Sequence, residues 1–406
     1  MRNVAGQDES IDDPRLQAGF VPADPDLTAA VRRRARAAFG APADLLVVAP
    51  GRIEIVGNHI DYNGGEVIAA AVDRWVAVAA RHRPDQQVRV MADDPGSRGE
   101  VFAVDDCLSV DAGDASGAAI RPDAARASVA ALHAAGITSG GVDLFYRGTI
   151  PPGIGLSSSS ALLVALVGAL AQLAGASLSR LAIARIAMDA EHRTGTPVGL
   201  LDQTASIAGG ILRFSNDAAR IRVLDAHLGD ALFALVDSGV RHAMPGSRYA
   251  VRVAECHEAL DLLRAAGHAL GTLAELPLRD LEQAVVLLPA NLANRVRHIV
   301  EEVARTSEAE AALEAGDLRR LGEIMNVSGH SSATLYDISH PAVEAVASVA
   351  RAVPGVYGAR MMGGGDGGSA IALLKREAVP ALTERLPSST ITICRIARGM
   401  TVMRDA

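Results

Sequence analysis

The chain contains 406 residues, with 39 lysines and arginines against 47 aspartates and glutamates and a formal net charge of −8. Hydrophobic residues make up 49% of it, which excludes wholesale disorder, whereas aromatic residues make up only 3%. The acidic balance disfavours a nucleic-acid binder that depends on a global basic field, although a locally positive site for an anionic substrate remains compatible with it.

A chain of this length predicts two domains of roughly 100–200 residues each. Residues 1–26 are polar and acidic and predict an N-terminal arm. Apolar periodicity then predicts helices and strands of an α/β (α+β) protein. In chain order these are helix 27–39, strand 45–49, strands within 67–80, helix 124–135, strand 142–146, a helix from 161 and helix 178–192.

The polar stretch 214–230 predicts a domain boundary, which divides the chain into domains 27–215 and 216–406. The second half predicts another set of alternating elements. These are strand 232–237, helices 249–266, 278–287 and 296–315, and two strands at 358–362 and 369–374 around a glycine turn.

The three cysteines are far apart and form no CxxC pair, which disfavours a disulfide scaffold or a thiolate zinc site. The polar N-terminus lacks the apolar region of a signal peptide, and the longest apolar stretch, 161–174, is short for a membrane span. We therefore expect a cytoplasmic protein with neither nucleic acid nor a membrane as a partner; a monomer and a homodimer both stay open.

The segment 50–65, PGRIEIVGNHIDYNGG, gathers Arg, Glu, Asn, His, Asp and Tyr into one turn-rich stretch. Such a cluster donates and accepts several hydrogen bonds at once, as binding of a polyol or sugar requires. A solvated loop with a Tyr-Asn-Gly-Gly turn is an equally good interpretation of this segment taken alone.

The segment 151–160, PPGIGLSSSS, leads directly into an apolar helix. A Gly/Ser loop at a helix N-terminus directs backbone N–H groups at one point, which suits a phosphate, and serine hydroxyls can ligate Mg²⁺ beside it. A flexible linker is the alternative, but a linker is rarely followed at once by a buried helix. We therefore favour a phosphate-binding loop.

A third loop, GGGDGG at 363–368, fits GxGxxG, but strand-like residues follow it where a dinucleotide-binding fingerprint requires a helix. It instead favours a turn that allows a close approach of backbone to a ligand. The chain has no GxxxxGK[ST], GxSxG or HExxH pattern, which excludes the Walker-type, hydrolase and zincin motifs.

Two acids flank a short loop after the second long helix. Glu191 ends the predicted helix, and Asp202 begins a short apolar one. Acids at helix ends are usually caps or solvated charges. Near a phosphate loop, however, two acids suit magnesium-dependent phosphoryl transfer, in which one holds the metal and the other orients or deprotonates the attacking hydroxyl.

The three loops in this order resemble the motifs of the GHMP small-molecule kinases, and within them those of the galactokinases, whose signature usually reads PGRVNLIGEHTDYNGG. Further matches are Ala190-Glu191-His192, Leu201-Asp202-Gln203, Val240-Arg241-His242, Tyr249, Glu255-Cys256, Met325-Asn326 and Leu335-Tyr336. The resemblance implies an N-terminal domain like ribosomal protein S5 domain 2, a C-terminal ferredoxin-like domain, and ATP-dependent phosphorylation of a sugar at its anomeric (C1) hydroxyl.

The resemblance also implies roles for single residues. Asp202 would be the catalytic base and Arg52 its partner, while Asn58, His59, Asp61 and Tyr249 would lie at the sugar. Residues for the ATP phosphates would be Gly153, Gly155, Ser157, Ser158 and Ser159, and those for Mg²⁺ would be Ser159 and Glu191. ATP and a small-molecule sugar are thus the expected partners.

The chain departs from this pattern at three positions. Asn58 stands where the signature has the glutamate that accepts from the C6 hydroxyl, Glu54 stands where it has Asn, and Asp366 replaces an apolar residue of the third loop. Asn58 is either a neutral variant or a change of specificity at C6, and in the second case a C6-modified or higher-carbon sugar, such as an octose of antibiotic biosynthesis, is the alternative substrate. A non-catalytic sugar/ATP sensor is disfavoured because the catalytic and phosphate-loop residues are present. The run 59–63 argues against a mevalonate or homoserine kinase.

Overall fold

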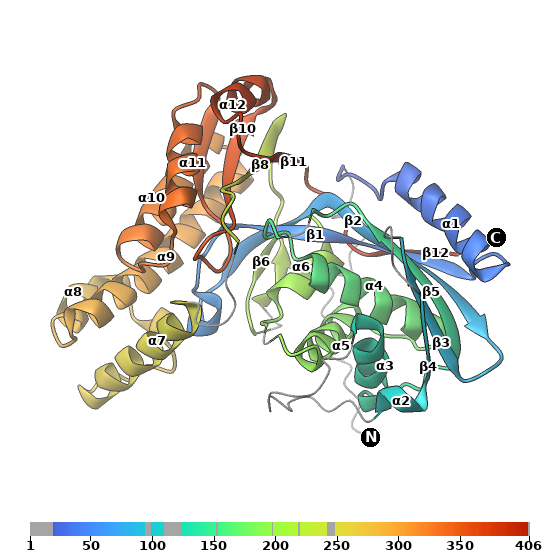
Figure 1. Ribbon diagram of the computed structural model, residues 1–406. Coiled ribbons are helices and arrows are strands. Elements are labelled where there is room, and N and C mark those ends of the chain that lie inside the picture. Colours follow the sequence, from blue (N-terminus) through green and yellow to red (C-terminus); the bar gives the residue numbers. More distant parts are fainter. Residues whose placement is uncertain are drawn as a thin grey trace.

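The computed structural model describes residues 19–93, 99–108, 123–151, 153–196, 198–217, 220–241 and 248–404. Figure 1 shows two sheets with helices packed on them, and the larger sheet has the order β12-β1-β2-β5-β3-β4, with β6 on β2 and β7 on β6. Its strands are β1 (Leu45–Val56), β2 (Val67–Arg83), β3 (Gln87–Ala92), β4 (Glu100–Ala103), β5 (Gly141–Gly148), β6 (Ile211–Phe214), β7 (Arg222–Val223) and β12 (Thr401–Arg404).

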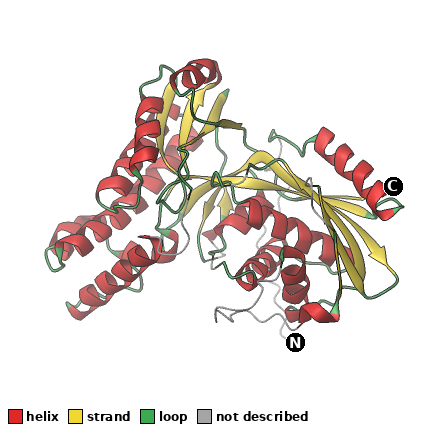
Figure 2. Ribbon diagram, in the orientation of Figure 1, coloured by secondary structure: helices red, strands yellow, loops and turns green. Residues whose placement is uncertain are grey.

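Helices cover both faces of the larger sheet (Figure 2). They are α1 (Pro25–Phe39), α2 (Asp105–Leu108), α3 (Ala124–Ala134), α4 (Ser158–Leu173), α5 (Arg180–Arg193) and α6 (Leu201–Ala208). Alternation along β1 explains the two layers, since Leu45 and Val47 pack with α3, α4 and α5, while Leu46 and Val48 pack with α1 on the other face.

The smaller sheet has four antiparallel strands in the order β11-β8-β10-β9. Its strands are β8 (Ala231–Asp237), β9 (Val356–Met361), β10 (Ser369–Lys375) and β11 (Ile391–Cys394). The helices around it are α7 (Arg248–Ala265), α8 (Leu281–Val285), α9 (Ala290–Ala315), α10 (Leu318–Thr334), α11 (Pro341–Arg351) and α12 (Val379–Arg385), with single 3₁₀ turns η2 (Asp61–Asn63), η4 (Leu273–Glu275), η5 (Leu278–Asp280) and η6 (Arg376–Ala378).

One hydrophobic cluster joins the two sheets. Ile53 and Ile55 of β1 pack in it with Phe233 of β8 and with Ile371 and Leu373 of β10, all of them buried. Because β1 runs from the larger sheet into this shared core, the polar residues near its C-terminal end lie at the junction of the two sheets. That junction is where the functional side chains gather.

The predicted α/β class is confirmed, and several boundaries differ. Helix α1 begins at Pro25 with Asp24 as its N-cap, so it takes the last two residues of the predicted arm, whose residues 1–18 lie outside the described part. Helix α4 begins at Ser158 rather than at residue 161, so three serines form its first turn. The helix expected at 278–287 is shorter and splits into η5 and α8.

The division of the chain at residues 215 and 216 stays a prediction, and the sheets depart from it at two places. Strand β7 pairs with β6, and the last strand, β12, returns to pair with β1 in the larger sheet. Within the part of the chain that the structure describes, no helix combines the length and apolarity needed to span a membrane.

Candidate active site

The structure brings the three glycine loops into contact with one another. Arg52 of the first loop donates its backbone N–H to Leu156 O (3.1 Å) and its Nη1 to Gly155 O (2.7 Å) in the second. Asn58 Nδ2 of the first loop donates to Gly363 O of the third at 3.0 Å. Segments separated by hundreds of residues therefore line one site at the junction of the sheets.

The second loop presents the N-terminus of α4 without a side-chain cap. Gly153 and Gly155 have φ of 73° and 85°, and Ser157, which precedes the helix, has φ of 54°. Its hydroxyl does not cap the helix but donates to Asp202 Oδ2 at 2.6 Å. No side chain of the described residues accepts from the first N–H groups of this 16-residue helix, including those of Ser158 and Ser159, so they suit an anion.

Arg52 and Asp202 form a two-pronged ion pair beside this helix. Arg52 Nε donates to Asp202 Oδ1 at 2.7 Å and Nη2 donates to Oδ2 at 2.9 Å. Only 12% and 19% of their side chains are exposed, and Ser157 adds a third hydrogen bond to the carboxylate. The carboxylate is thus fixed in orientation, as a group that aligns a reacting hydroxyl must be.

Glu191 lies buried behind the first turn of α4. Its Oε1 accepts from Ser159 Oγ at 2.6 Å, and its Oε2 accepts from Ser160 Oγ at 2.8 Å and Gln203 Nε2 at 2.7 Å. Burial raises the pKa of Glu191, although these hydrogen bonds oppose the shift. The side chain therefore forms one unit with two serines of the predicted serine run.

A group of rings surrounds His59, which has φ of 63° and is buried. Its ring centroid lies 5.0 Å from Tyr336 and 5.4 Å from Tyr249, and Tyr62 Oη lies 3.1 Å from its Nδ1. Burial lowers the pKa of His59 to about 3, and its Nε2 is buried without a hydrogen-bond partner among the described residues. A neutral imidazole nitrogen is thus left for a ligand.

Asp61, the first residue of η2, is half-buried beside the loop that leads into α6, the helix of Asp202. A side chain added at Gly199 of that loop would place its Cβ 3.6 Å from Asp61 Oδ2. Burial, followed by the charge of Glu54, raises the pKa of Asp61 to about 6. Tyr249, the second residue of α7, is 41% exposed, and its ring packs beside the ring of His59.

The structure places Asn58 differently from the other expected sugar contacts. It is only 1% exposed, its Nδ2 donates to Glu54 Oε1 (3.1 Å) as well as to Gly363 O, and its Oδ1 accepts from Ser332 Oγ at 3.0 Å. Its contact with a sugar stays a prediction. Glu54, which stands where the signature has Asn, lies within this polar network.

Asp366 connects the third loop to Arg248, so its charge is paired. It has φ of 56°, and its carboxylate accepts from Arg248 N at 2.6 Å and Arg248 Nε at 2.5 Å. Its own N–H donates to Ile338 O at 2.9 Å. The replacement therefore ties the glycine loop to the start of α7, directly before Tyr249. His242, one of the sequence matches, lies outside the described residues.

The sequence analysis missed a set of buried charges that hold the first loop. Glu302 of α9 accepts from the N–H groups of Gly57 (3.0 Å) and Asn58 (3.2 Å), and pairs with Arg305 at 2.6 Å. Arg360 of β9 is fully buried and donates to Ile55 O at 2.9 Å. In the sequence, Glu302 and Arg305 form only a pair of opposite charges on one helix face. This pattern does not indicate that Glu302 binds the first loop.

His298 of α9 supports the same loop. Burial lowers its pKa to about 4, so it is neutral near pH 7. Its Nε2 lies 3.0 Å from Asn58 O and its Nδ1 lies 2.8 Å from Ser331 Oγ, which fits donation to the carbonyl and acceptance from the serine. The first loop is thus anchored by a helix of the second half of the chain.

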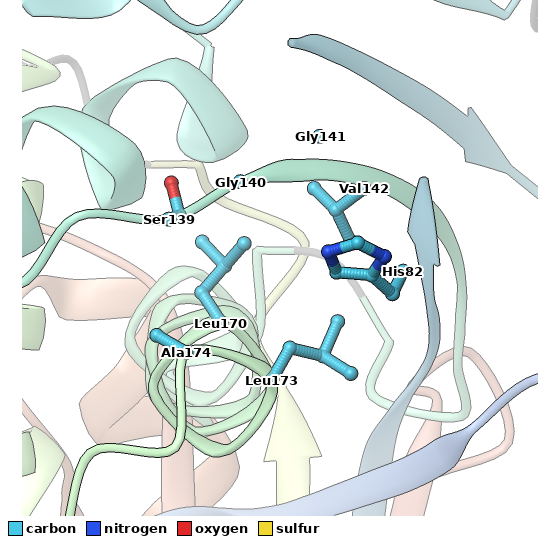
Figure 3. A pocket seen from close by; sticks show the side chains of 8 residues that line it. All are labelled: His82, Ser139, Gly140, Gly141, Val142, Leu170, Leu173 and Ala174. Atoms are coloured by element: carbon cyan, nitrogen blue, oxygen red, sulfur yellow. The ribbon is translucent and has the colours of Figure 1, made fainter. Parts of the chain in front are cut away.

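A separate small cavity of about 170 Å³ lies between the end of α4 and the start of β5 (Figure 3). None of the residues that line it belongs to the three loops, so it is not part of this site. The lining residues are His82, Ser139, Gly140, Gly141, Val142, Leu170, Leu173 and Ala174. Among the described residues, no group of three or more His, Cys, Asp or Glu is placed to hold a metal ion.

Comparisons with known proteins agree with this geometry. Residues 36–82 match the galactokinase galactose-binding signature, residues 123–210 the GHMP kinases N terminal domain, and residues 309–390 the GHMP kinases C terminal domain. The first match covers the loop of His59 and Asp61, and the second covers the phosphate loop, Glu191 and Asp202.

Relatives that match most of the chain are also galactokinases. The chain is 35% identical to a galactokinase of Chloroflexus aggregans (84% of this chain, 86% of the relative). It is 32% identical to one of Roseiflexus sp. (93% and 98%). The crystal structure of Lactococcus lactis galactokinase complexed with galactose superposes with a TM-score of 0.83 at 28% identity, covering 92% of this chain and 99% of that one.

Proposed function

Because the chain belongs to the GHMP kinase family, in which it is a galactokinase-like sugar kinase, we propose that it transfers the γ-phosphoryl group of ATP to the anomeric (C1) hydroxyl of galactose or a galacto-configured sugar. One observation carries the proposal. The Arg52–Asp202 ion pair lies against the uncapped N-terminus of α4, so a fixed carboxylate and a phosphate-binding helix end share one site.

Asp202 is the residue that meets the reacting hydroxyl. Held by Arg52 and Ser157, its carboxylate accepts a hydrogen bond from the sugar O1–H and aligns the oxygen with the γ-phosphorus. As the O1–P bond forms and the bond from phosphorus to the bridging oxygen of ADP breaks, the hydroxyl proton passes to Asp202. Arg52 stabilises the charge that develops on the phosphoryl oxygens.

The phosphates of ATP bind at the loop around Gly153 and Gly155 and at the first turn of α4, where N–H groups and the helix dipole favour negative charge. Mg²⁺ fits the pair of Ser159 and Glu191, because this ion prefers hard oxygens and takes one or two protein ligands beside phosphates and water. When bound, the ion neutralises phosphate charge.

Replacing Glu191 by glutamine should raise the free Mg²⁺ concentration needed for half-maximal activity by at least about 10-fold, because the carboxylate ligand is lost. Ser159→Ala should act in the same direction. Ser160→Ala is the matched control, since Ser160 contacts the other oxygen of Glu191 and should shift the requirement little. Titration of activity against free Mg²⁺ at saturating ATP measures it. Equal shifts of the Mg²⁺ requirement in Ser159→Ala and Ser160→Ala would mean that both serines have only a structural role.

Galactose is the substrate that the galactose-binding signature and the galactose-bound relative support. Asn58 keeps the C6-modified or higher-carbon sugar as the second candidate, because the position expected at C6 carries an amide in place of a carboxylate. A cytoplasmic location and the state of assembly, monomer or homodimer, stay predictions.

A sugar panel tests the proposal. The purified chain is incubated with ATP, Mg²⁺ and galactose, glucose, C6-extended galacto-sugars, mevalonate or homoserine, and ADP release is followed. We expect turnover of galactose and ³¹P–¹H coupling of the product phosphate to H1. A phosphate at another carbon would overturn the C1 assignment, preference for an extended sugar would favour the second candidate, and sugar binding without turnover would favour the sensor.

A further inference from the structure

Strand β1 places Glu54 on the same face as Arg52. Ile53 and Ile55 are fully buried in the core shared by the two sheets. Since side chains alternate along a strand, Arg52 and Glu54 point to the opposite face, about 7 Å apart along the strand axis. Arg52 meets Asp202 there, so Glu54 lies one strand repeat from the group that aligns the reacting hydroxyl.

The amide of Asn58 is committed to the protein. Both of its N–H hydrogens have acceptors, in Glu54 Oε1 and Gly363 O, and its oxygen accepts from Ser332. An asparagine amide has no further hydrogen to donate. Turning it toward a sugar would leave buried partners unsatisfied, which is costly.

The carboxylate of Glu54 is held from one side only. Oε1 accepts from Asn58 Nδ2 at 3.1 Å and from Arg360 Nη2 at 3.0 Å. Oε2 makes no hydrogen bond to any residue that the structure describes, and it is not among the polar atoms sealed from solvent without a partner. Arg360 thus fixes the orientation and leaves one charged acceptor oxygen open.

The charge of Glu54 acts on two of the groups expected at the sugar. After burial it contributes to the raised pKa of Asp61, and after burial and the charge of Asp61 it contributes to the raised pKa of Tyr249. Asp61 belongs to η2 and Tyr249 to α7, on other sides of the same site. These effects agree with the placement that strand geometry gives.

We propose that Glu54, rather than Asn58, determines specificity at the end of the sugar away from the transferred phosphoryl group, with Glu54 Oε2 accepting a hydrogen bond from the C6 hydroxyl. Asn58 acts as a positioning residue that holds Oε1. The carboxylate has moved four positions along the chain relative to the usual signature, while its hydrogen-bonding chemistry is kept. The inference rests on the proposed sugar kinase activity.

A comparison of galactose with 6-deoxygalactose tests it. For the unaltered protein, kcat/KM should be roughly 10- to 100-fold lower for the 6-deoxy sugar, the size expected for a hydrogen bond to a charged group. In Glu54→Gln the ratio should shrink to a few-fold, because both sugars then lack the charged contact. Glu66→Gln is the matched control, since Glu66 also pairs with arginines, Arg213 and Arg220, and it should keep the full ratio.

The outcomes distinguish a failure of the proposed function from a failure of the role given to Glu54. If the unaltered protein phosphorylates no sugar, the proposed function fails. If it phosphorylates galactose and Glu54→Gln keeps the full ratio, or if 6-deoxygalactose is as good a substrate as galactose, this inference is overturned. Two measurements remain if Glu54→Gln does not fold. The double variant Glu54→Asn/Asn58→Glu restores the residues of the usual signature at both positions. The comparison of the two sugars on the unaltered protein needs no variant.

The pH dependence gives a readout that a structural role would not move. The pKa of Asp61 is raised to about 6 by burial, then by Glu54 of β1 and more weakly by Asp202 of α6, so kcat/KM for the sugar should fall as pH drops below about 6 and Asp61 becomes protonated. Removing the negative charge in Glu54→Gln lowers this pKa. The acidic limb should then move to lower pH, and an unmoved limb would count against the placement of Glu54.

Discussion

Replacing Asp202 by asparagine is expected to lower kcat by about 10²- to 10⁴-fold, because the amide cannot take the proton of the sugar hydroxyl. The shape of the side chain and one of the two acceptors for Arg52 are retained, so binding of the sugar should change much less than kcat. Steady-state kinetics with galactose, together with calorimetric sugar binding in the absence of ATP, measures the two effects separately.

Asp189→Asn is the control for this variant. Asp189 lies on the neighbouring helix α5 and pairs with Arg193 one helical turn away, with 37% of its side chain exposed. It should leave both kcat and sugar binding close to those of the unaltered protein. Turnover that survives in Asp202→Asn would refute the role of Asp202, whereas loss of sugar binding and turnover together would point to a collapsed site.

Replacing Glu302 by glutamine is expected to lower the free energy of unfolding by about 3–5 kcal/mol, the usual cost of breaking a buried ion pair. Glu302 is fully buried, and its loss leaves Arg305 with only the more exposed carboxylate of Glu301 as a countercharge and weakens the acceptor for the N–H groups of Gly57 and Asn58. KM for the sugar should also rise, because the loop that carries His59 loses its anchor. Denaturant unfolding and kinetics check the two effects.

Glu308→Gln is the matched control on the same helix, since its pair with Arg320 is half-exposed on both sides. An exposed pair contributes roughly 0–1 kcal/mol, so the control should change stability little. Similar losses in the two variants would contradict the anchoring role of Glu302.

Acid unfolding gives a second test of Glu302. Burial alone would raise its pKa, but the charges of Arg305, His298 and Arg360 outweigh burial and hold the pKa at about 2, below its ordinary value of 4.5. A lowered carboxylate pKa stabilises the folded state above pH 4.5, and this contribution is lost as pH falls toward 2. Glu302→Gln should therefore show a weaker loss of stability over that interval.

The residues of the candidate site stand out in the sequence because they occur in short local motifs. Glycines, serines and an arginine in short runs identify the phosphate loop and the first loop, and the acids Glu191 and Asp202 follow at helix ends. The structure adds the contacts that unite them, from Arg52 to Asp202 and from Ser159 to Glu191. Their roles toward ATP, Mg²⁺ and the sugar stay predictions until the variants are measured.

Only 3% of the residues are aromatic, which favours a site that depends mainly on hydrogen bonds. The structure instead gathers three of the five tyrosines, Tyr62, Tyr249 and Tyr336, around His59. Composition gives the number of rings and says nothing of where they meet. Tyr336 is separated from Tyr62 by 274 residues, yet their hydroxyls lie 2.6 Å apart.

By itself, the sequence determined the α/β class and the three loops and gave candidate residues for phosphoryl transfer, because these depend on periodicity and on short motifs. Only the tertiary structure decided that Asn58 is enclosed, that Glu54 keeps an open carboxylate oxygen, and that Glu302 and Arg360 hold the first loop. The reason is physical. Burial and charge pairing depend on side chains brought together from β1, α9 and β9, and no local pattern records which distant partner compensates a buried charge.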